Sequence, residues 1–326
     1  MSNYIHTIGP EHDGQRIDNF IIGRLPGVPR GRIYRAFRSG EVRLNGGRVK
    51  PSGRLAEGDE VRVPPLRVSE KPELLIPDWM KKQVKQAIIH ETDVIKVLNK
   101  PAGTPVHVGT GVAGGVIETI AHLEDDPYWQ LVHRLDRQTS GCLLVARQGK
   151  VLRALSNQFR ERSVQKVYLA VVSGRWEHGA ITIDKPLEKH VLEGGERMVT
   201  VSPDGVSAVT RVEPLWVSDG YSLLEIQLGT GRTHQIRVHL ADAGHPVLGD
   251  QKYADKRDSR RWKKAYGDSL FLHAVCLRFS LDDEPWEARA SVSSSWRSLA
   301  VWPEIKEMGL VSVTNACNLL DSNDSH

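Results

Sequence analysis

The sequence predicts an α+β protein made of two unequal parts. With 326 residues the chain is longer than one small domain needs. After residue 89 many strand-like segments follow one another with only two or three long helical patterns, which is typical of a mainly antiparallel mixed sheet with flanking helices. A proline-rich stretch separates this part from a small module before it. We therefore expect a small domain over 14–64, a linker over 65–88, a large domain over 89–310 and a disordered tail over 311–326.

The small module begins with two helical patterns. Apolar residues recur at spacings of three and four over 16–22, and the second pattern, over 30–38, places Ile33 and Phe37 on one face. Gly40 is positioned to cap the second helix. Two short helices are therefore expected before any strand.

A hairpin signal follows. Asn45-Gly46 stands between the short apolar runs 42–44 and 48–49, and such a dipeptide strongly favours a two-residue hairpin turn. Gly58-Asp59 then precedes the alternating segment 60–63. The module is expected to end in short antiparallel strands.

The charge of the chain is unevenly distributed. Residues 15–67 hold twelve Arg or Lys against five acids, a net charge of +7, whereas the whole chain carries +4. A local basic module on a near-neutral body indicates a polyanion-binding attachment. The alternative is an ordinary charged surface exposed to solvent.

Several classes of protein are disfavoured by what the sequence lacks. The start of the chain has no signal-peptide pattern, and no apolar run reaches the length of a membrane span. The three cysteines are far apart, and His234 and His239 do not form a metal-binding pair. The glycine-rich stretch 103–115 lacks the spacing of a nucleotide-binding loop. We expect a cytoplasmic monomer that uses neither metal nor cofactor.

The large domain is expected to consist mainly of strands. They fall at 93–101, 142–146, 166–174, 180–183, 208–212, 222–228 and 270–279. Helical spacing appears over 152–159 and again over 233–243, where Gly244 caps the pattern and Pro246 stops it. A basic segment, 252–264, is either an RNA contact or a mobile charged loop.

The run 132–141 carries the residue best suited to chemistry. Asp136 lies between Arg134 and Arg137, and opposite charges favour the ionised carboxylate. An ionised carboxylate without a second acid beside it is suited to nucleophilic attack. No paired acid of the kind that glycosidases use stands out near it. The alternative is an aspartate that caps the turn or pairs with an arginine.

Two further segments complete the candidate site. In the strand 166–174, Tyr168 faces away from Val167 and Leu169, so its ring is free to face a pocket or to pack in the core. In a helix starting near Thr233, His234 and Arg237 are three residues apart and share a face.

These three segments resemble the signatures of the RluA-type pseudouridine synthase family. They read His-Arg-Leu-Asp-x-x-Thr-Ser-Gly at 133–141, Lys-x-Tyr-Leu-Ala at 166–170 and Thr-Gly-Arg-Thr-His-Gln-Ile-Arg-Val-His at 230–239. Shorter similarities at 63–68, 115–118 and 194–207 favour a subgroup that acts on ribosomal RNA of the large subunit. Leu228-Gly229 stands where many relatives have a proline.

The resemblance implies a role for each site residue. Asp136 would be the nucleophile, Arg237 its partner, and Tyr168 the ring that stacks on the uracil and a candidate for the later proton removal. The substrate would also be contacted by a further group: Arg134, which would fill the vacated space or hold the flipped phosphate, Ile236, Arg232 and His133. The target nucleotide must leave its stack before it can react.

The small module resembles the S4 RNA-binding domain, which presents its second helix and hairpin to structured RNA. That resemblance implies five phosphate-binding cations: Arg32, Arg35, Arg43, Arg48 and Lys50. The expected function is isomerisation of uridines in 23S ribosomal RNA to pseudouridine without a cofactor. The alternatives are a synthase acting on tRNA or another rRNA site, and a non-catalytic S4 RNA-binding protein.

Overall fold

A computed structural model describes residues 4–25, 28–66, 75–108, 114–147, 149–191, 197–299 and 301–307. The contacts divide the chain into two compact units. Unit 1 comprises residues 1–75 with 148–150, and unit 2 comprises 76–147 with 151–326. The tail expected over 311–326 lies outside the described residues.

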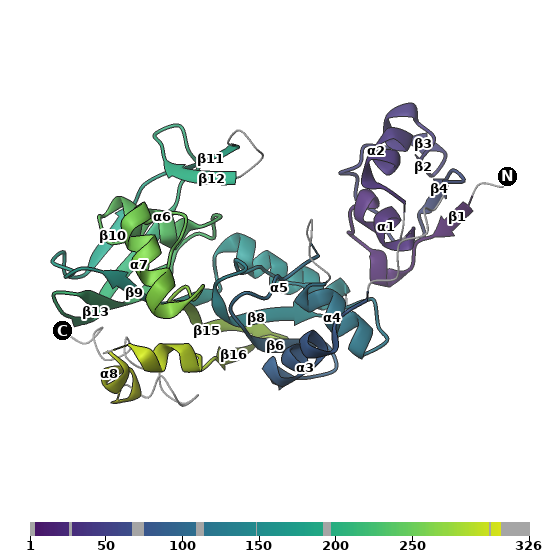
Figure 1. The fold of residues 1–326 in the computed structure, drawn as a ribbon. Coiled ribbons are helices and arrows are strands. Elements are labelled where there is room, and N and C mark those ends of the chain that lie inside the picture. The colour runs from purple at the N-terminus through teal and green to yellow at the C-terminus, as the bar shows by residue number, and fades with distance from the viewer. Residues whose placement is uncertain are drawn as a thin grey trace. The chain divides into compact units, whose positions relative to one another are not determined.

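Unit 1 contains the predicted helices and hairpin (Figure 1). Its elements are β1 (Tyr4–Thr7), the short 3-10 helix η1 (Pro10–His12), α1 (Ile17–Arg24), α2 (Arg30–Ser39), β2 (Arg43–Leu44), β3 (Gly47–Arg48) and β4 (Glu60–Val63). The four strands form an antiparallel sheet in the order β1-β4-β2-β3. The first strand was not predicted.

The two local signals in unit 1 are confirmed. Gly40 ends α2 in the left-handed conformation, with φ of 71°, which a glycine adopts without steric cost. Asn45 and Gly46 both have positive φ and join β2 to β3. Ile33 and Phe37 are buried in the core that α2 shares with α1.

The expectation of an extended linker over 65–88 is wrong in its second half. Residues 78–87 form α3 (Asp78–Ala87), whose Met80, Val84 and Ala87 are buried in the core of unit 2. These three residues recur at helical spacing, and the proline that suggested a linker, Pro77, stands directly before the helix, where it is tolerated.

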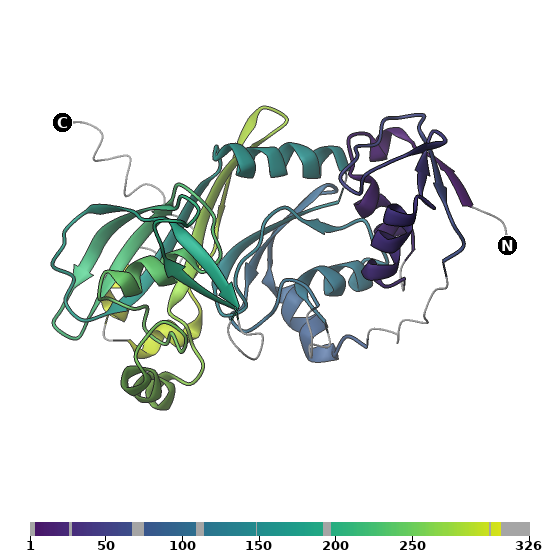
Figure 2. The ribbon, with the colours of Figure 1, turned by 90° about the horizontal axis from the view of Figure 1, so that it is seen from above.

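Unit 2 is built on one ten-stranded sheet (Figures 1 and 2). Its main path runs β10-β13-β14-β9-β15-β8-β6-β5, with β16 paired to β15 and β7 to β8. Within this sheet β15 and β8 run parallel, whereas the other pairings are antiparallel. The predicted mainly antiparallel mixed sheet is confirmed.

The strands of this sheet have the following bounds: β5 (Ile88–Glu91), β6 (Ile95–Lys100), β7 (Gln130–Leu131), β8 (Ser140–Ala146), β9 (Gln165–Ser173), β10 (Ile181–Asp184), β13 (Val209–Val217), β14 (Tyr221–Leu228), β15 (Leu272–Leu281) and β16 (Glu284–Arg289). A separate two-stranded sheet pairs β11 (Leu187–Val191) with β12 (Arg197–Val201).

The helices of unit 2 include several that were not predicted. Besides α3 they are α4 (Val116–Leu123), α5 (Gly149–Glu161), α6 (Gln235–Asp242), α7 (Lys256–Tyr266), the short 3-10 helix η2 (Ser294–Ser298) and α8 (Trp302–Glu307). The mobile-loop alternative for 252–264 is wrong over most of that segment. Asp255 caps α7 by accepting hydrogen bonds from two backbone N–H groups.

The alternation predicted along β9 separates two hydrophobic clusters. Val167, Leu169 and Val171 pack on one side, and Tyr168 packs with Ala170 and Val172 on the other. Tyr168 therefore lies on the same side of the sheet as Leu135 and Ile236, which belong to the two other signature segments.

Candidate active site

Asp136 lies in the turn that connects β7 to β8. The Thr139 N–H donates a hydrogen bond of 3.2 Å to the Asp136 carbonyl and so closes this turn. The Asp136 side chain is 23% exposed, so its carboxylate is accessible to a ligand. Three features of the surrounding protein fix the turn in place.

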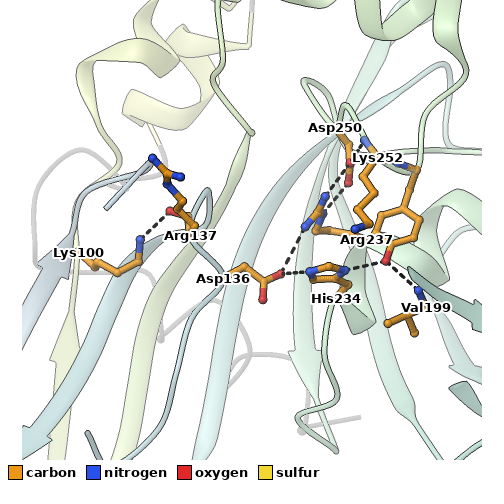
Figure 3. Close-up of polar contacts among 9 residues, drawn as sticks. Lys100, Asp136, Arg137, Val199, His234, Arg237, Asp250 and Lys252 are labelled. Atoms are coloured by element: carbon orange, nitrogen blue, oxygen red, sulfur yellow. Dashed lines mark hydrogen bonds and ion pairs between the residues drawn. The ribbon is translucent and has the colours of Figure 1, made fainter. Parts of the chain in front are cut away.

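The first feature is a buried lysine. Lys100, at the end of β6, donates hydrogen bonds of 2.9–3.0 Å to the carbonyls of Pro101, Thr104 and Arg137, which matches the three donors of an ammonium group. Figure 3 shows its contact with Arg137, next to Asp136. Burial lowers the pKa of Lys100 to about 7, although the charge of Asp136 acts in the opposite direction.

The second feature is a fully buried histidine under the start of β8. The His273 Nε2–H donates to the Ala290 carbonyl at 2.9 Å, so Nδ1 accepts from the Ser140 hydroxyl at 2.8 Å. Burial lowers the pKa of His273 to about 4. This neutral ring therefore joins the end of the aspartate turn to β15.

The third feature is a glycine that allows the parallel strands to approach. Gly141 has a φ of 108°, and a Cβ at this position would lie 2.2 Å from the Ala274 carbonyl oxygen on β15. Only glycine fits there. The close approach of β15 therefore explains why the signature at 133–141 ends in glycine.

The side-chain nitrogens closest to the Asp136 carboxylate come from residues distant in sequence. Arg237 Nη1 lies 3.5 Å from Asp136 Oδ2, and His234 Nε2 lies 3.7 Å from the same atom (Figure 3). The alternative of an Asp136 carboxylate paired with Arg134 or Arg137 is not observed among the described residues. Arg137 instead donates its Nε–H to the Gly103 carbonyl at 2.9 Å.

Arg237 is itself held by a second carboxylate. Its Nε and Nη2 donate to the two oxygens of Asp250 at 2.7 and 2.8 Å, and its guanidinium lies 5.1 Å from the centre of the Tyr253 ring. Asp250 also accepts from the N–H groups of Lys252 and Tyr253. Burial alone would raise the pKa of Asp250, but the hydrogen bonds and charge of Arg237 hold it below its usual value.

His234 has a conformation that the sequence did not indicate. The helix begins at Gln235, and His234 precedes it with a φ of 54°, so the prediction that His234 and Arg237 share a helical face is wrong. The His234 Nδ1 lies 2.6 Å from the Tyr253 hydroxyl, while Nε2 points toward Asp136 (Figure 3). Burial lowers the pKa of His234.

The Gln235 side chain explains why the backbone turns here. Its amide donates to the Val209 carbonyl and the Thr210 hydroxyl, and its oxygen accepts from the Thr230 hydroxyl and the Arg232 N–H. Two of these hydrogen bonds anchor the start of α6 to β13, and the other two hold the segment between β14 and α6. This buried network orients the residues on either side of Gln235.

A cavity of 110 Å³ lies between the three signature segments. A single water molecule needs only about 10–15 Å³ on the same measure, so the cavity admits a larger group. Six of the predicted residues line it: Asp136, Tyr168, Arg237, Ile236, Arg134 and Arg232. Most of the residues around this cavity are therefore predictable from the sequence.

The Tyr168 ring forms a buried wall of this cavity and is 7% exposed. Burial raises the pKa of the Tyr168 phenol, and the negative charge of Asp136 raises it further. At neutral pH the phenol is therefore protonated.

His133 does not line the cavity of Asp136. Its Nε2 accepts a hydrogen bond from the Leu144 N–H at 3.0 Å, and its ring stacks on Phe159. Burial lowers the pKa of His133 to about 3. This histidine supports β8 and lines a neighbouring hollow rather than the cavity itself.

The five predicted phosphate-binding residues lie in unit 1. Arg35, Arg48 and Lys50 are exposed, and Arg32 forms a half-exposed ion pair with Glu41 at 3.2 Å. Arg43 is directly opposite Arg48 on β3 and opposite Arg62 on β4. Three arginines therefore lie side by side across three strands, which ordinarily disfavours a sheet.

The described part of the chain holds no group of three or more His, Cys, Asp or Glu side chains that could bind a metal ion. A helix long and apolar enough to cross a membrane is likewise absent from the ranges that the structure describes.

Comparisons with known proteins identify the family. A family model for RNA pseudouridylate synthase matches residues 94–242. The chain is 46% identical over 276 residues to ribosomal large subunit pseudouridine synthase C of Yersinia pestis, covering 84% of this chain and 86% of that protein. It is 45% identical over 284 residues to the protein of the same name from Escherichia coli (strain K12), covering 85% and 88%.

A solved structure of the same family has a similar fold. The human RNA pseudouridylate synthase domain containing 1 matches with a TM-score of 0.53 at 26% identity, covering 63% of this chain and 83% of that one. The chain belongs to the RNA pseudouridylate synthase family, and it is an enzyme that isomerises uridine in RNA to pseudouridine.

Four residues of the site were missed or misjudged from sequence: Lys100, His234, Asp250 and Tyr253. Asp250 and Tyr253 lie in the segment after α6, which contains no regular spacing that links it to Arg237. A lysine ending an apolar strand was the one available signal for Lys100.

Proposed function

We propose that this chain converts uridines of large-subunit (23S) ribosomal RNA to pseudouridine, with Asp136 as the nucleophile. The observation that carries the proposal is the cavity in which Asp136, Tyr168 and Arg237 meet, although they come from segments far apart in the sequence. The large-subunit target is supported by the relatives at 45–46% identity, whose names state it.

The reaction begins when the target nucleotide leaves its stack and enters the cavity. Asp136 attacks either C1′ of the ribose, which releases the uracil with the electron pair of the N1–C1′ bond, or C6 of the base, in which case the N1–C1′ bond breaks while the uracil is held covalently by Asp136. The uracil turns, C5 forms the new bond to C1′, and Asp136 is released. A proton then leaves C5 and N1 gains one, so the reaction is an isomerisation with no redox change.

Each neighbour of Asp136 has a role in this scheme. Arg237 orients the carboxylate, and Asp250 fixes Arg237 by two hydrogen bonds. Tyr168 provides a stacking surface for the uracil, and such contacts contribute about 1–3 kcal/mol per base. Its hydroxyl is a candidate for the later removal of the proton from C5. Ile236 and Arg232 bound the base, and Arg134 either fills the space that the flipped nucleotide leaves or holds its phosphate.

Unit 1 would supply affinity for structured RNA. The neighbouring arginines Arg43, Arg48 and Arg62 repel one another, and a polyanion that binds across the sheet would offset this repulsion. Arg32, Arg35 and Lys50 extend this surface to α2 and to the end of the hairpin. Residues of one chain line the cavity of Asp136. We propose a monomer that acts where ribosomal RNA is made, in the cytoplasm.

Mapping pseudouridine in the rRNA and tRNA of a strain lacking this gene tests the proposal. The expected result is the loss of specific pseudouridines from 23S rRNA, restored by the wild-type gene and not by an Asp136→Asn allele. Loss confined to tRNA or to small-subunit rRNA would assign the enzyme to another target. An unchanged map would refute the proposal and favour a role in RNA binding.

A further inference from the structure

A second hollow lies directly beside the cavity of Asp136. Its volume is 520 Å³, and it shares five lining residues with that cavity: Arg134, Tyr168, Leu228, Gly231 and Arg232. A chain-like ligand that places one unit against Asp136 therefore has a continuous path into this hollow.

The hollow is lined by cations and by no carboxylate. The cations are Arg134, Arg160, Arg162, Lys166 and Arg232. Across the described ranges, Arg160 is the one member of this group that forms an ion pair within 4 Å, with Glu161 at 3.7 Å. Positive charge gathered in a concave surface attracts an anion.

Lys166 is the most informative of these cations. It is only 7% exposed, and it precedes Tyr168 by two residues on β9, so both side chains face the same side of the sheet. Its Nζ lies 5.9 Å from the centre of the Phe159 ring. Burial lowers the pKa of Lys166, and the charge of Arg162 lowers it further. A buried ammonium next to another cation is unfavourable unless an anion joins them.

Arg162 provides an independent observation from the backbone. It follows α5 with a φ of 63°, and the Ser163 N–H donates to the Gln158 carbonyl to end the helix. Glycine is the usual residue in this left-handed position, because a side chain there is strained. The fold alone would favour glycine, so the arginine is explained by its position on the rim of the hollow.

We propose that this hollow binds a backbone phosphate of the nucleotide next to the uridine held at Asp136. The inference rests on the proposed RNA substrate and adds a subsite to it. Arginine and lysine bind phosphate oxygens through charge-assisted hydrogen bonds, and such contacts fix the register of the strand without reading its sequence. The subsite would therefore position the target uridine rather than select the neighbouring base.

The test uses Arg162→Gly, because glycine suits the backbone at this position. The variant should unfold at a temperature no lower than that of the wild type. With in vitro transcribed 23S rRNA as substrate, we expect kcat/KM to fall about tenfold, mainly through KM, since a lost charge-assisted hydrogen bond removes binding of substrate and transition state alike. The slope of log binding constant against log KCl concentration should become shallower by about 0.7–0.9 for one phosphate contact.

A second variant and a control complete the design. Lys166→Met keeps an apolar stem beside Phe159. It should show the same change in KM and in the slope of log binding constant against log KCl concentration, called the salt slope below. Lys306→Gln removes one charge from α8, which packs against the opposite side of β9 through Ile305, and should change neither quantity.

The outcomes separate the two proposals. If Arg162→Gly and Lys166→Met both keep the wild-type KM and salt slope, the phosphate subsite is refuted while pseudouridine formation still stands. If the wild-type enzyme makes no pseudouridine in this RNA, the proposed rRNA target is refuted. The salt slopes of the variants then still decide whether the hollow binds RNA phosphate.

Discussion

Arg237 makes two hydrogen bonds of 2.7 and 2.8 Å to Asp250 but approaches Asp136 with a single nitrogen, at 3.5 Å. Asp250 is fully buried, whereas Asp136 opens to the cavity. The buried carboxylate thus anchors the guanidinium, and the exposed one is left with most of its lone pairs available to a substrate. These contacts suit Asp250 to holding Arg237 in place and Asp136 to reacting with the substrate.

Asp136→Asn should abolish pseudouridine formation and leave RNA binding intact. Asparagine keeps the shape of the side chain but is not a nucleophile for this reaction. Mass spectrometry of digested 23S rRNA measures the product, and filter binding measures affinity. Turnover at the wild-type rate would show that another group attacks the nucleotide.

Tyr168→Phe should separate the ring from its hydroxyl. We expect RNA affinity close to that of the wild type, since the stacking surface is kept, and kcat lower by at least about 10²-fold if the hydroxyl takes part in proton transfer. Tyr128→Phe, at a 60% exposed position, is the control and should have no effect. Full activity of Tyr168→Phe would limit Tyr168 to stacking.

Asp250→Ala should destabilise the protein by about 3–5 kcal/mol, because it leaves the Arg237 guanidinium buried without its main partner. The matched control is Asp219→Ala. It breaks the exposed pair with Arg175 and should cost less than about 1 kcal/mol. Urea unfolding of both variants measures the difference, and equal effects would contradict an anchoring role for Asp250.

Stability should fall as the pH is lowered from about 6.5 toward 4, in part because of His273. The pKa of His273 is about 4 in the folded protein, against about 6.5 for an unperturbed histidine. Between these values the unfolded chain binds more protons, so acid favours unfolding. Between pH 7 and pH 4.5 the wild type should lose about 2–3 kcal/mol more than His273→Gln. Parallel pH profiles of the two proteins in urea unfolding would argue against a neutral buried ring.

Arg43→Gln should weaken RNA binding while slightly stabilising unit 1. Arg43 lies opposite two other arginines, and each like-charge pair across strands costs about 0.2–1 kcal/mol. For binding to 23S rRNA, the slope of log binding constant against log salt concentration should become shallower by about 0.7–0.9. Arg175→Gln removes the same charge from unit 2 and serves as the control. If Arg43→Gln binds RNA as tightly as the wild type, the arginines on β2, β3 and β4 do not contact the RNA.

Local signals explain which parts of the fold were predictable. Gly40, Asn45-Gly46 and the alternation along β9 act through neighbouring residues alone, so the sequence indicated them correctly. The helices α3, α4 and α7 were missed, since proline, glycine and dense charge suggested linkers and loops. The N-cap Asp255 was a usable signal for α7.

The site was predictable for a different reason. Motif resemblance identified Asp136, Tyr168 and Arg237, and the cavity brings them together. The conformation of His234 and the anchoring by Asp250 depend on tertiary contacts between segments without regular spacing. Sequence periodicity holds no information about such contacts, and the assumed start of the helix at Thr233 displaced His234 onto the wrong face.

The parallel pairing of β8 with β15 has a consequence for the time at which activity arises during synthesis. Ser140 and His273 are 133 residues apart, yet each needs the other for the aspartate turn to be held. Contacts so distant in sequence form late, since long loops must close first. A nascent polypeptide that has exposed only its first two hundred residues would lack a competent turn, and enzymatic competence would appear only after most of the gene has been translated.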